Sequence, residues 1–272
     1  MSNPVFSSSG VFTDSSNRRG RGPAAPMDAP TLEQMYQAPT ATTRDTGRLT
    51  YDDVIMKTGG LLALLAVVAA GTWMVSDTMP NLYIVGAIVG FVLAMVNIFK
   101  KQPSPALITA YAIAEGVFVG GLSALLDGIY PGVAMQALLA TAVTFAVTLF
   151  AFKSGKVRVT PKANKIFMIA MLSYLAFSLV NVGLMIFGGT DSAWGLRTEA
   201  TIFGIPLGVV IGAVAVLLGA YSLVVDFDGI ERGVRQGAPA KFAWTAAFGL
   251  IVTIVWLYVE FLRIFAILQG RD

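Results

Sequence analysis

Four carboxylic acids lie inside or at the edge of long apolar stretches of the sequence. Asp226 ends one such stretch, Asp228 follows two residues later, and Glu260 lies within the last stretch. Glu115 lies near the middle of an earlier one. A carboxylate in a stretch long enough to cross a bilayer is costly, so it requires a partner, water, a proton or a cation. These four acids are therefore the candidate pH-sensing and ion-pathway residues.

Three of these acids also have a purely structural interpretation. Asp226 and Asp228 could be solvated interfacial residues beside a loop. On a helix, Asp228 points about 200° away from Asp226, so at most one of the two faces a given partner. Glu260 could be neutralised locally by Arg263, three residues later on the same helix.

The structural alternative for Glu115 is a hydrogen bond between helices. A protonated Glu115 could bond to a polar residue such as Asn181 or Tyr174 and hold two helices together. Both interpretations stay open at this level.

The composition is that of a membrane protein. Of the 272 residues, 56% are hydrophobic and 13% are charged, whereas a soluble domain has about 25% charged residues. There is no Cys and no His, which excludes disulfides, thiol chemistry and most zinc and haem sites. The net charge of +3 does not indicate nucleic acid as a partner, because the basic residues lie between the apolar stretches.

The sequence contains none of the common enzyme motifs. It has no Ser-centred nucleophile elbow, no paired aspartates of an intramembrane protease and no Gly-rich phosphate loop. We therefore expect neither an enzyme nor a bound cofactor, with calcium as a permeant ion only.

Seven apolar stretches are each close to or above the roughly 20 residues that cross a bilayer as a helix. They lie near 56–75, 81–99, 104–126, 132–152, 166–188, 200–225 and 242–268. The predicted fold class is an all-α integral membrane protein, with a seven-transmembrane-helix bundle over 51–272. Residues 1–50 are rich in Ser, Pro, Thr, Gly and Arg, which predicts a disordered cytoplasmic tail.

The basic residues alternate between the connections of these seven spans. They precede the first span and fill the second, fourth and sixth connections: Arg44, Arg48, Lys57, Lys100, Lys101, Lys153, Lys156, Arg158, Lys162, Lys165, Arg232, Arg235 and Lys241. The other connections hold no basic residue except Arg197. The positive-inside rule then predicts a cytoplasmic N-terminus and an outer C-terminus in the plasma membrane.

The region from Tyr221 to Glu260 resembles the Bax-inhibitor family, also called the transmembrane Bax inhibitor motif family. That family ends its sixth span with an Asp followed four residues later by Ile, as in Asp226 and Ile230. Its seventh span carries Leu-Tyr-Leu-Asp-Phe and then Leu-Phe. Here the corresponding text is Leu-Tyr-Val-Glu-Phe over 257–261, followed by Ile264 and Phe265.

The resemblance implies a calcium-permeable leak pathway. In bacterial members two acids on the sixth and seventh spans form a pH-sensitive pair, and by motif these are Asp226 and Glu260. The same two residues would then be the tentative calcium ligands. If the seventh helix enters the membrane at Phe242, however, Glu260 lies about 27 Å along it. Contact between the two acids is therefore implied by the family and left open by the spacing.

The function predicted from the sequence is a pH-sensitive calcium leak channel, gated by the carboxylate pair. Two close carboxyls share a proton because both cannot cheaply ionise. Its expected partners are the lipid bilayer, calcium and protons. Two alternatives remain: a non-conducting regulator or scaffold that binds a membrane protease or another membrane protein, and a proton-coupled cation exporter.

Overall fold

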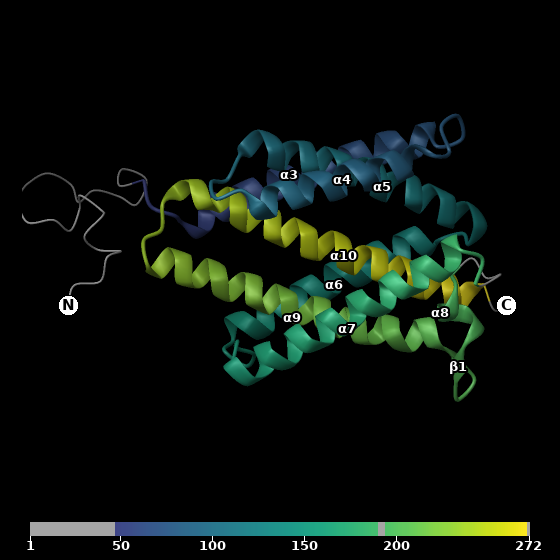
Figure 1. Ribbon diagram of the computed structural model, residues 1–272. Helices are drawn as coiled ribbons and strands as arrows, with labels where there is room; N and C mark the ends of the chain where they lie inside the picture. Colours follow the sequence, from purple (N-terminus) through teal and green to yellow (C-terminus); the bar gives the residue numbers. More distant parts are fainter. Residues whose placement is uncertain (1–46, 190–193, 271–272) are drawn as a thin grey trace, which may run out of the picture. The chain divides into compact units, whose positions relative to one another are not determined.

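The protein forms a bundle of long helices in a computed structural model, which describes residues 47–189 and 194–270 (Figure 1). Within this part seven helices are long and apolar enough to cross a membrane. They are α3 (Tyr51–Val75), α4 (Leu82–Phe99), α5 (Pro105–Ile129), α6 (Val133–Lys153), α7 (Pro161–Ile186), α9 (Leu207–Arg235) and α10 (Ala243–Gln269). The predicted fold class, an all-α membrane protein with seven spans, is confirmed.

Most of the predicted tail, residues 1–46, lies outside the described residues. The last four residues of the predicted tail, 47–50, lie within the described part of the chain and are not disordered. The backbone N–H of Leu49 donates to the carbonyl of Ala238 at 2.7 Å, and the N–H of Ala240 donates to the carbonyl of Gly47 at 2.8 Å. Leu49 is buried. The segment before α3 is therefore strapped to the connection between α9 and α10.

The sixth span differs most from its predicted limits of 200–225. Short elements occupy its first residues: α8 (Leu196–Glu199), β1 (Thr201–Ile202) and β2 (Ile205–Pro206), the two strands pairing antiparallel. At the other end, α9 continues nine residues beyond Asp226. It ends at Arg235, and Gly237 follows two residues later with a φ of +65°. The Ala238 N–H bonds to the Gly233 carbonyl and the Gly237 N–H to that of Val234, which is a Schellman motif. Asp226 therefore lies well inside a helix.

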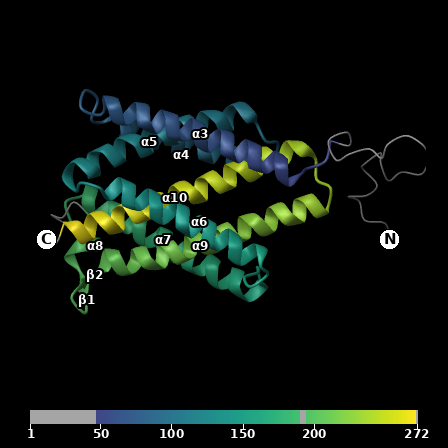
Figure 2. The same cartoon turned by 180° about the vertical axis from the view of Figure 1, so that it is seen from behind.

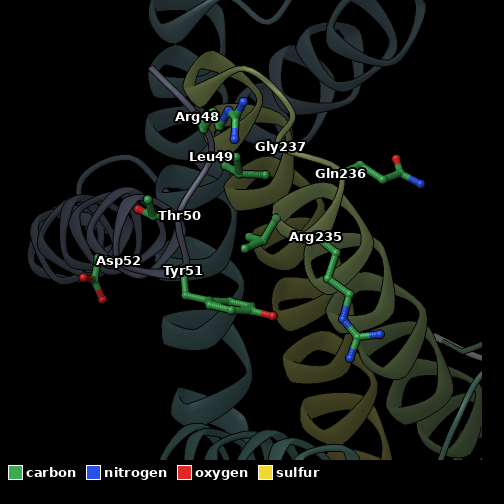
Figure 3. Close-up of a pocket in the computed structure, with 9 residues that line it drawn as sticks. Arg48, Leu49, Thr50, Tyr51, Asp52, Arg235, Gln236 and Gly237 are labelled. Carbon is green, nitrogen blue, oxygen red and sulfur yellow. The ribbon is translucent and has the colours of Figure 1, made fainter. Parts of the chain in front are cut away.

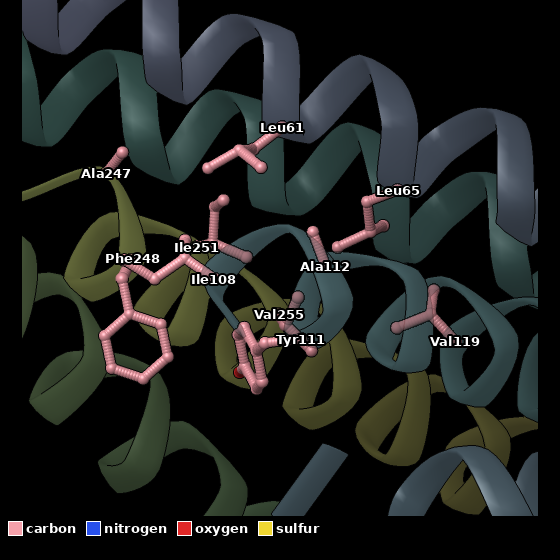
Figure 4. Close-up of a cluster of buried hydrophobic side chains, with 10 residues drawn as sticks. All are labelled: Leu61, Leu65, Ile108, Tyr111, Ala112, Val119, Ala247, Phe248, Ile251 and Val255. Atoms are coloured by element: carbon pink, nitrogen blue, oxygen red, sulfur yellow. The ribbon is translucent and has the colours of Figure 1, made fainter. Parts of the chain in front are cut away.

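Helix α10 lies between two groups of helices. Figures 1 and 2 show α3, α4 and α5 on one side of it and α6, α7 and α9 on the other. Buried side chains of α3, α5 and α10 meet in one cluster, which includes Leu61, Ile108, Tyr111, Phe248 and Ile251 (Figure 4). A second cluster joins α9 and α10 through Leu223, Leu250 and Leu257. The acid-bearing last helix is thus the central one.

Glycines let the helices approach closely, as the small residues of the spans predict. A Cβ added to Gly116 of α5 would come within 2.8 Å of the Leu65 carbonyl oxygen on α3. A Cβ on Gly86 of α4 would lie 2.6 Å from the amide nitrogen of Phe118. Lipid tails supply no hydrophobic driving force between helices, so these backbone contacts matter for assembly.

Gly120→Ala should lower the free energy of unfolding by about 1–3 kcal/mol, because the added methyl overlaps rigid backbone. The three atoms nearest to its Cβ position all belong to the backbone of Ala69. The control is Gly128→Ala on the same helix, where the new Cβ meets no atom within 4 Å. There the better helix propensity of Ala should raise stability by up to about 1 kcal/mol. Thermal unfolding in one detergent measures both, and equal effects would contradict close α3–α5 packing.

Candidate functional site: buried carboxyls along α9 and α10

The carboxyl of Asp226 lies between α9 and α10. Its Oδ2 accepts a hydrogen bond of 2.8 Å from the Thr253 hydroxyl, and the Ser222 hydroxyl is 3.4 Å from that of Thr253. Its Oδ1 is 3.5 Å from the Cβ position of Gly249. Asp226 shares one face of α9 with Gly212, because fourteen residues are close to four helical turns. The acid is therefore bonded to one hydroxyl, that of Thr253, which in turn lies close to the hydroxyl of Ser222.

Glu260 is completely buried at a different level of the same interface. Its Oε1 accepts a hydrogen bond from the Tyr174 hydroxyl of α7 and is 3.0 Å from Nη2 of Arg263. Its Oε2 has no hydrogen-bond partner within the described residues and lies 4.0 Å from the Cβ position of Gly212 on α9. The local Glu260–Arg263 pair predicted as the structural alternative is thus present.

Tyr174 joins this acid to two arginines. Besides donating to Glu260, its hydroxyl oxygen is 3.3 Å from Nη1 of Arg263 and 3.5 Å from Nη2 of Arg197. Arg197, on the short helix α8, is 4% exposed and donates to the Ser178 hydroxyl at 3.1 Å. Its guanidinium also lies over the ring of Phe177, a cation–π contact. The cluster ties α7 and α8 to α10.

The structure does not bring Asp226 and Glu260 together. A Cβ on Gly219 would meet Leu257, and one on Gly212 would meet Ile264, so Glu260 is level with about residue 216 of α9. At 1.5 Å per residue, Asp226 is then about 15 Å away along the helix axis. Asp226 contacts Thr253 instead. The pair implied by the family resemblance, and the calcium site made by both acids, are not formed in this arrangement.

Buried leucines occupy the interval between the two acids. Leu223 and Leu257 are both fully buried and belong to one apolar cluster. Among the described residues there is no group of three or more His, Cys, Asp or Glu side chains that could hold a metal ion. Each carboxyl is therefore a separate polar site on the α9–α10 interface, with apolar packing between them.

Asp228 faces away from this interface. Its Oδ2 is 2.9 Å from Nε of Arg232, one turn later on α9. This agrees with the predicted 200° between the two aspartates, and with the interpretation of Asp228 as a partly solvated residue near the helix end.

Glu115 lies between α4 and α5, and its predicted partners were wrong. The Glu115 carboxyl is 3.0 Å from the Cβ position of Gly90 on α4 and interacts with the Tyr111 hydroxyl one turn earlier. Tyr174 bonds to Glu260, and Asn181 bonds to the backbone of residues 194 and 196. Glu115 therefore touches neither of the residues suggested for it.

Glu115→Gln should leave cation flux nearly unchanged, because Gln has the same shape and keeps an oxygen for Tyr111. Flux into vesicles at several calcium concentrations measures this. Glu115→Leu, which removes the polar group, should change stability rather than flux. A several-fold slower entry in Glu115→Gln would place Glu115 on the ion path.

Two functional contacts had only weak signals in the sequence. Arg197 was the one exception to the alternation of basic residues, and that exception marked a buried arginine. Thr253 is one of two threonines in a largely apolar helix, a common occurrence that does not by itself indicate a partner. For neither residue does the sequence indicate which helix carries its partner.

The fold and these sites define a class: a polytopic α-helical membrane protein with single carboxyls buried between its helices. The chain belongs to the Bax inhibitor 1 like family, whose model matches residues 3–270. The resemblance seen in the last third of the sequence is thereby confirmed. This is a family of membrane proteins that is not known for enzymes. No curated protein matches the chain.

Proposed function

We propose that the protein is a pH-sensitive leak pathway for cations, calcium foremost, across the plasma membrane, and not an enzyme. The observation that carries the proposal is the presence of two carboxyls, the partly buried Asp226 and the fully buried Glu260, at different depths of one helix interface. Calcium binds carboxylate, hydroxyl and carbonyl oxygens, and Asp226 brings a carboxylate together with the Thr253 hydroxyl. Family membership supports a membrane function of this kind.

In this proposal the pathway follows the interface of α9 and α10, and the described arrangement is its closed state. Leu257 packs on Gly219 and fills the interval between the two acids. A protonated Asp226 carries no charge, so it can remain beside the apolar packing of Leu257 without a large desolvation cost. An ionised Asp226 attracts a divalent cation, and the hydration of that cation separates the helices. Protonation thus acts through Asp226 alone, instead of through a proton shared with Glu260, which is paired with Arg263.

We further propose that the N-terminus is cytoplasmic and the C-terminus outside. The segment before α3 and the connections after α4, α6 and α9, which hold most of the basic residues, lie at one end of the bundle. Three contacts join them. Arg158 pairs with Glu231 at 2.8 Å, Lys241 donates to Gln102 at 2.6 Å, and Leu49 bonds to Ala238. We call this the basic end. Clustering of Lys and Arg at one end favours its placement in the cytoplasm.

The test is calcium entry into liposomes that contain the purified full chain and an enclosed calcium indicator. The proposal expects entry above that of empty liposomes, and a rate that changes with pH. Absence of flux at every pH would contradict conduction and favour a non-conducting regulator. Calcium movement that requires an imposed proton gradient would instead indicate a proton-coupled exporter.

A further inference from the structure

A hollow of about 490 Å³ opens at the basic end, between the start of α3 and the end of α9 (Figure 3). Its lining includes two arginines, Arg48 and Arg235, and one acid, Asp52, together with Tyr51 and Gln236. These residues supply two guanidinium groups, a phenol and an amide, all of which can donate hydrogen bonds. In Figure 3, Tyr51 points toward the side of Arg235, whereas Asp52 extends on the other side of the chain. The hollow therefore presents mainly donors.

Within the described part of the chain, one of the two cations, Arg48, has no ion-pair partner. None of the ion pairs within the described residues involves Arg48. Its side chain lies across Gly237, where a Cβ would be 3.4 Å from its Cδ. Arg235 uses one nitrogen for Glu231 and keeps its other donors. The Arg48 backbone is fixed by its bridge to Pro239, so the unpaired guanidinium is carried by an ordered segment.

The lengths of the helices place this hollow at the depth of lipid headgroups. Helix α9 has 29 residues and is about 43 Å long, whereas the hydrocarbon core is about 30 Å thick. Its last turn, with Arg235, therefore lies beyond the hydrocarbon. Ile55, one turn after Tyr51 on the same face of α3, is 66% exposed, so an apolar surface continues from the hollow into the membrane.

We propose that this hollow binds the phosphate headgroup of an anionic phospholipid, with an acyl chain lying along α3 past Ile55. Basic pockets between transmembrane helices on the cytoplasmic side suit anionic headgroups. Arginine favours phosphate because its planar fork donates two parallel hydrogen bonds. The apolar continuation at Ile55 favours a lipid over free phosphate, which shares the same headgroup chemistry.

The site connects the lipid to the helices that carry the buried carboxyls. Arg48 precedes α3, and Arg235 is the last residue of α9. A lipid headgroup bound in the hollow would add contacts beside the backbone strap between residues 47–49 and 238–240. Bound lipid therefore holds the end of α9 against α3.

The experiment titrates the detergent-solubilised full chain with phosphatidylglycerol, phosphatidylcholine and inorganic phosphate, and follows bound lipid by native mass spectrometry. We expect phosphatidylglycerol to bind at least tenfold more tightly than phosphatidylcholine. Arg48→Gln should weaken phosphatidylglycerol binding about tenfold, as the loss of one charge-assisted hydrogen bond predicts. Arg48→Lys keeps the charge but loses the paired donors of the guanidinium. Its affinity for phosphatidylglycerol should therefore lie between that of the unaltered protein and that of Arg48→Gln.

The matched control is Arg232→Gln. Arg232 is on the same last turns of α9 and its side chain is 62% exposed, but it pairs with Asp228 and does not line the hollow. Its substitution should leave lipid binding unchanged. The proposal is overturned if Arg232→Gln weakens binding as much as Arg48→Gln, or if both lipids bind equally. Displacement of the lipid by inorganic phosphate at similar concentration would also overturn it, in favour of a free-phosphate site.

Discussion

Cation flux through the Asp226→Asn variant should be independent of pH. Asparagine has nearly the shape of a protonated aspartic acid and carries no charge, and its amide oxygen still accepts the hydrogen bond from Thr253. The variant should therefore show, at every pH, the flux that the unaltered protein shows at low pH. Calcium entry into liposomes across a pH series measures this complete loss of response.

The control for this prediction is Asp228→Asn, which removes a charge two residues away on the other side of α9. Because Asp228 pairs with Arg232 near the helix end, its pH–flux curve should match that of the unaltered protein. A curve for Asp226→Asn that overlays the unaltered one would rule out Asp226 as the titrating group. A flat curve for Asp228→Asn alone would mean that the other aspartate senses pH.

The separation of the acids also changes what a double variant should do. If Asp226 and Glu260 shared a proton, removing both would do no more than removing one. Sites more than about 10 Å apart with no shared partner have nearly additive effects. The changes that Asp226→Asn and Glu260→Gln make in the logarithm of the flux should therefore add.

Glu260→Ala should lower the free energy of unfolding by about 3–5 kcal/mol, the usual cost of removing one partner from a buried ion pair. The substitution leaves Arg263 without its carboxylate and removes the acceptor of the Tyr174 hydroxyl. The guanidiniums of the buried Arg197 and the partly buried Arg263, which both approach the Tyr174 hydroxyl, are then left without the Glu260 carboxylate. Denaturant unfolding in mixed micelles measures the loss.

A comparison with Asp228→Ala separates the stability lost by breaking a buried ion pair from the stability lost by removing any carboxylate. The Asp228–Arg232 pair is partly exposed, and pairs of that kind contribute about 0.5 kcal/mol or less on a helix. The double variant Glu260→Ala/Arg263→Met should recover part of the loss, because it removes an unpaired charge along with its former partner. Equal losses in Glu260→Ala and Asp228→Ala would show that the Glu260 cluster does not stabilise the fold.

The seven spans could be predicted because length and apolar composition are local properties of the chain. The end of α9 could not be located in this way, because hydropathy marks the part of a helix that lies in the hydrocarbon and not the residue at which the helix ends. From Gly229 to Arg235 the chain becomes polar but stays helical, supported by pairs one turn apart, Asp228 with Arg232 and Glu231 with Arg235. This extension moves Asp226 from the expected helix end to an interior position.

The sequence also singled out the candidate acids and the local partner of Glu260, Arg263, but it did not indicate their partners on other helices. The motif placed Asp226 and Glu260 on adjacent helices, and both do lie at the α9–α10 interface. Their relative level depends on how Gly219 meets Leu257 and Gly212 meets Ile264, and such a register follows from packing between helices. Tyr174 lies 86 residues from Glu260 in the sequence, so no local pattern could connect them.

The hairpin of α9 and α10 has a consequence for how the protein is made. Asp226 and Thr253 are only 27 residues apart, and the two helices that carry them are consecutive. An aspartate at the centre of a lone helix costs about 3 kcal/mol to insert into the membrane. If both helices leave the translocon together, the acid enters lipid already bonded to its hydroxyl. Because Glu260 also lies on α10, its contact with Tyr174 can form only when this last helix enters the membrane.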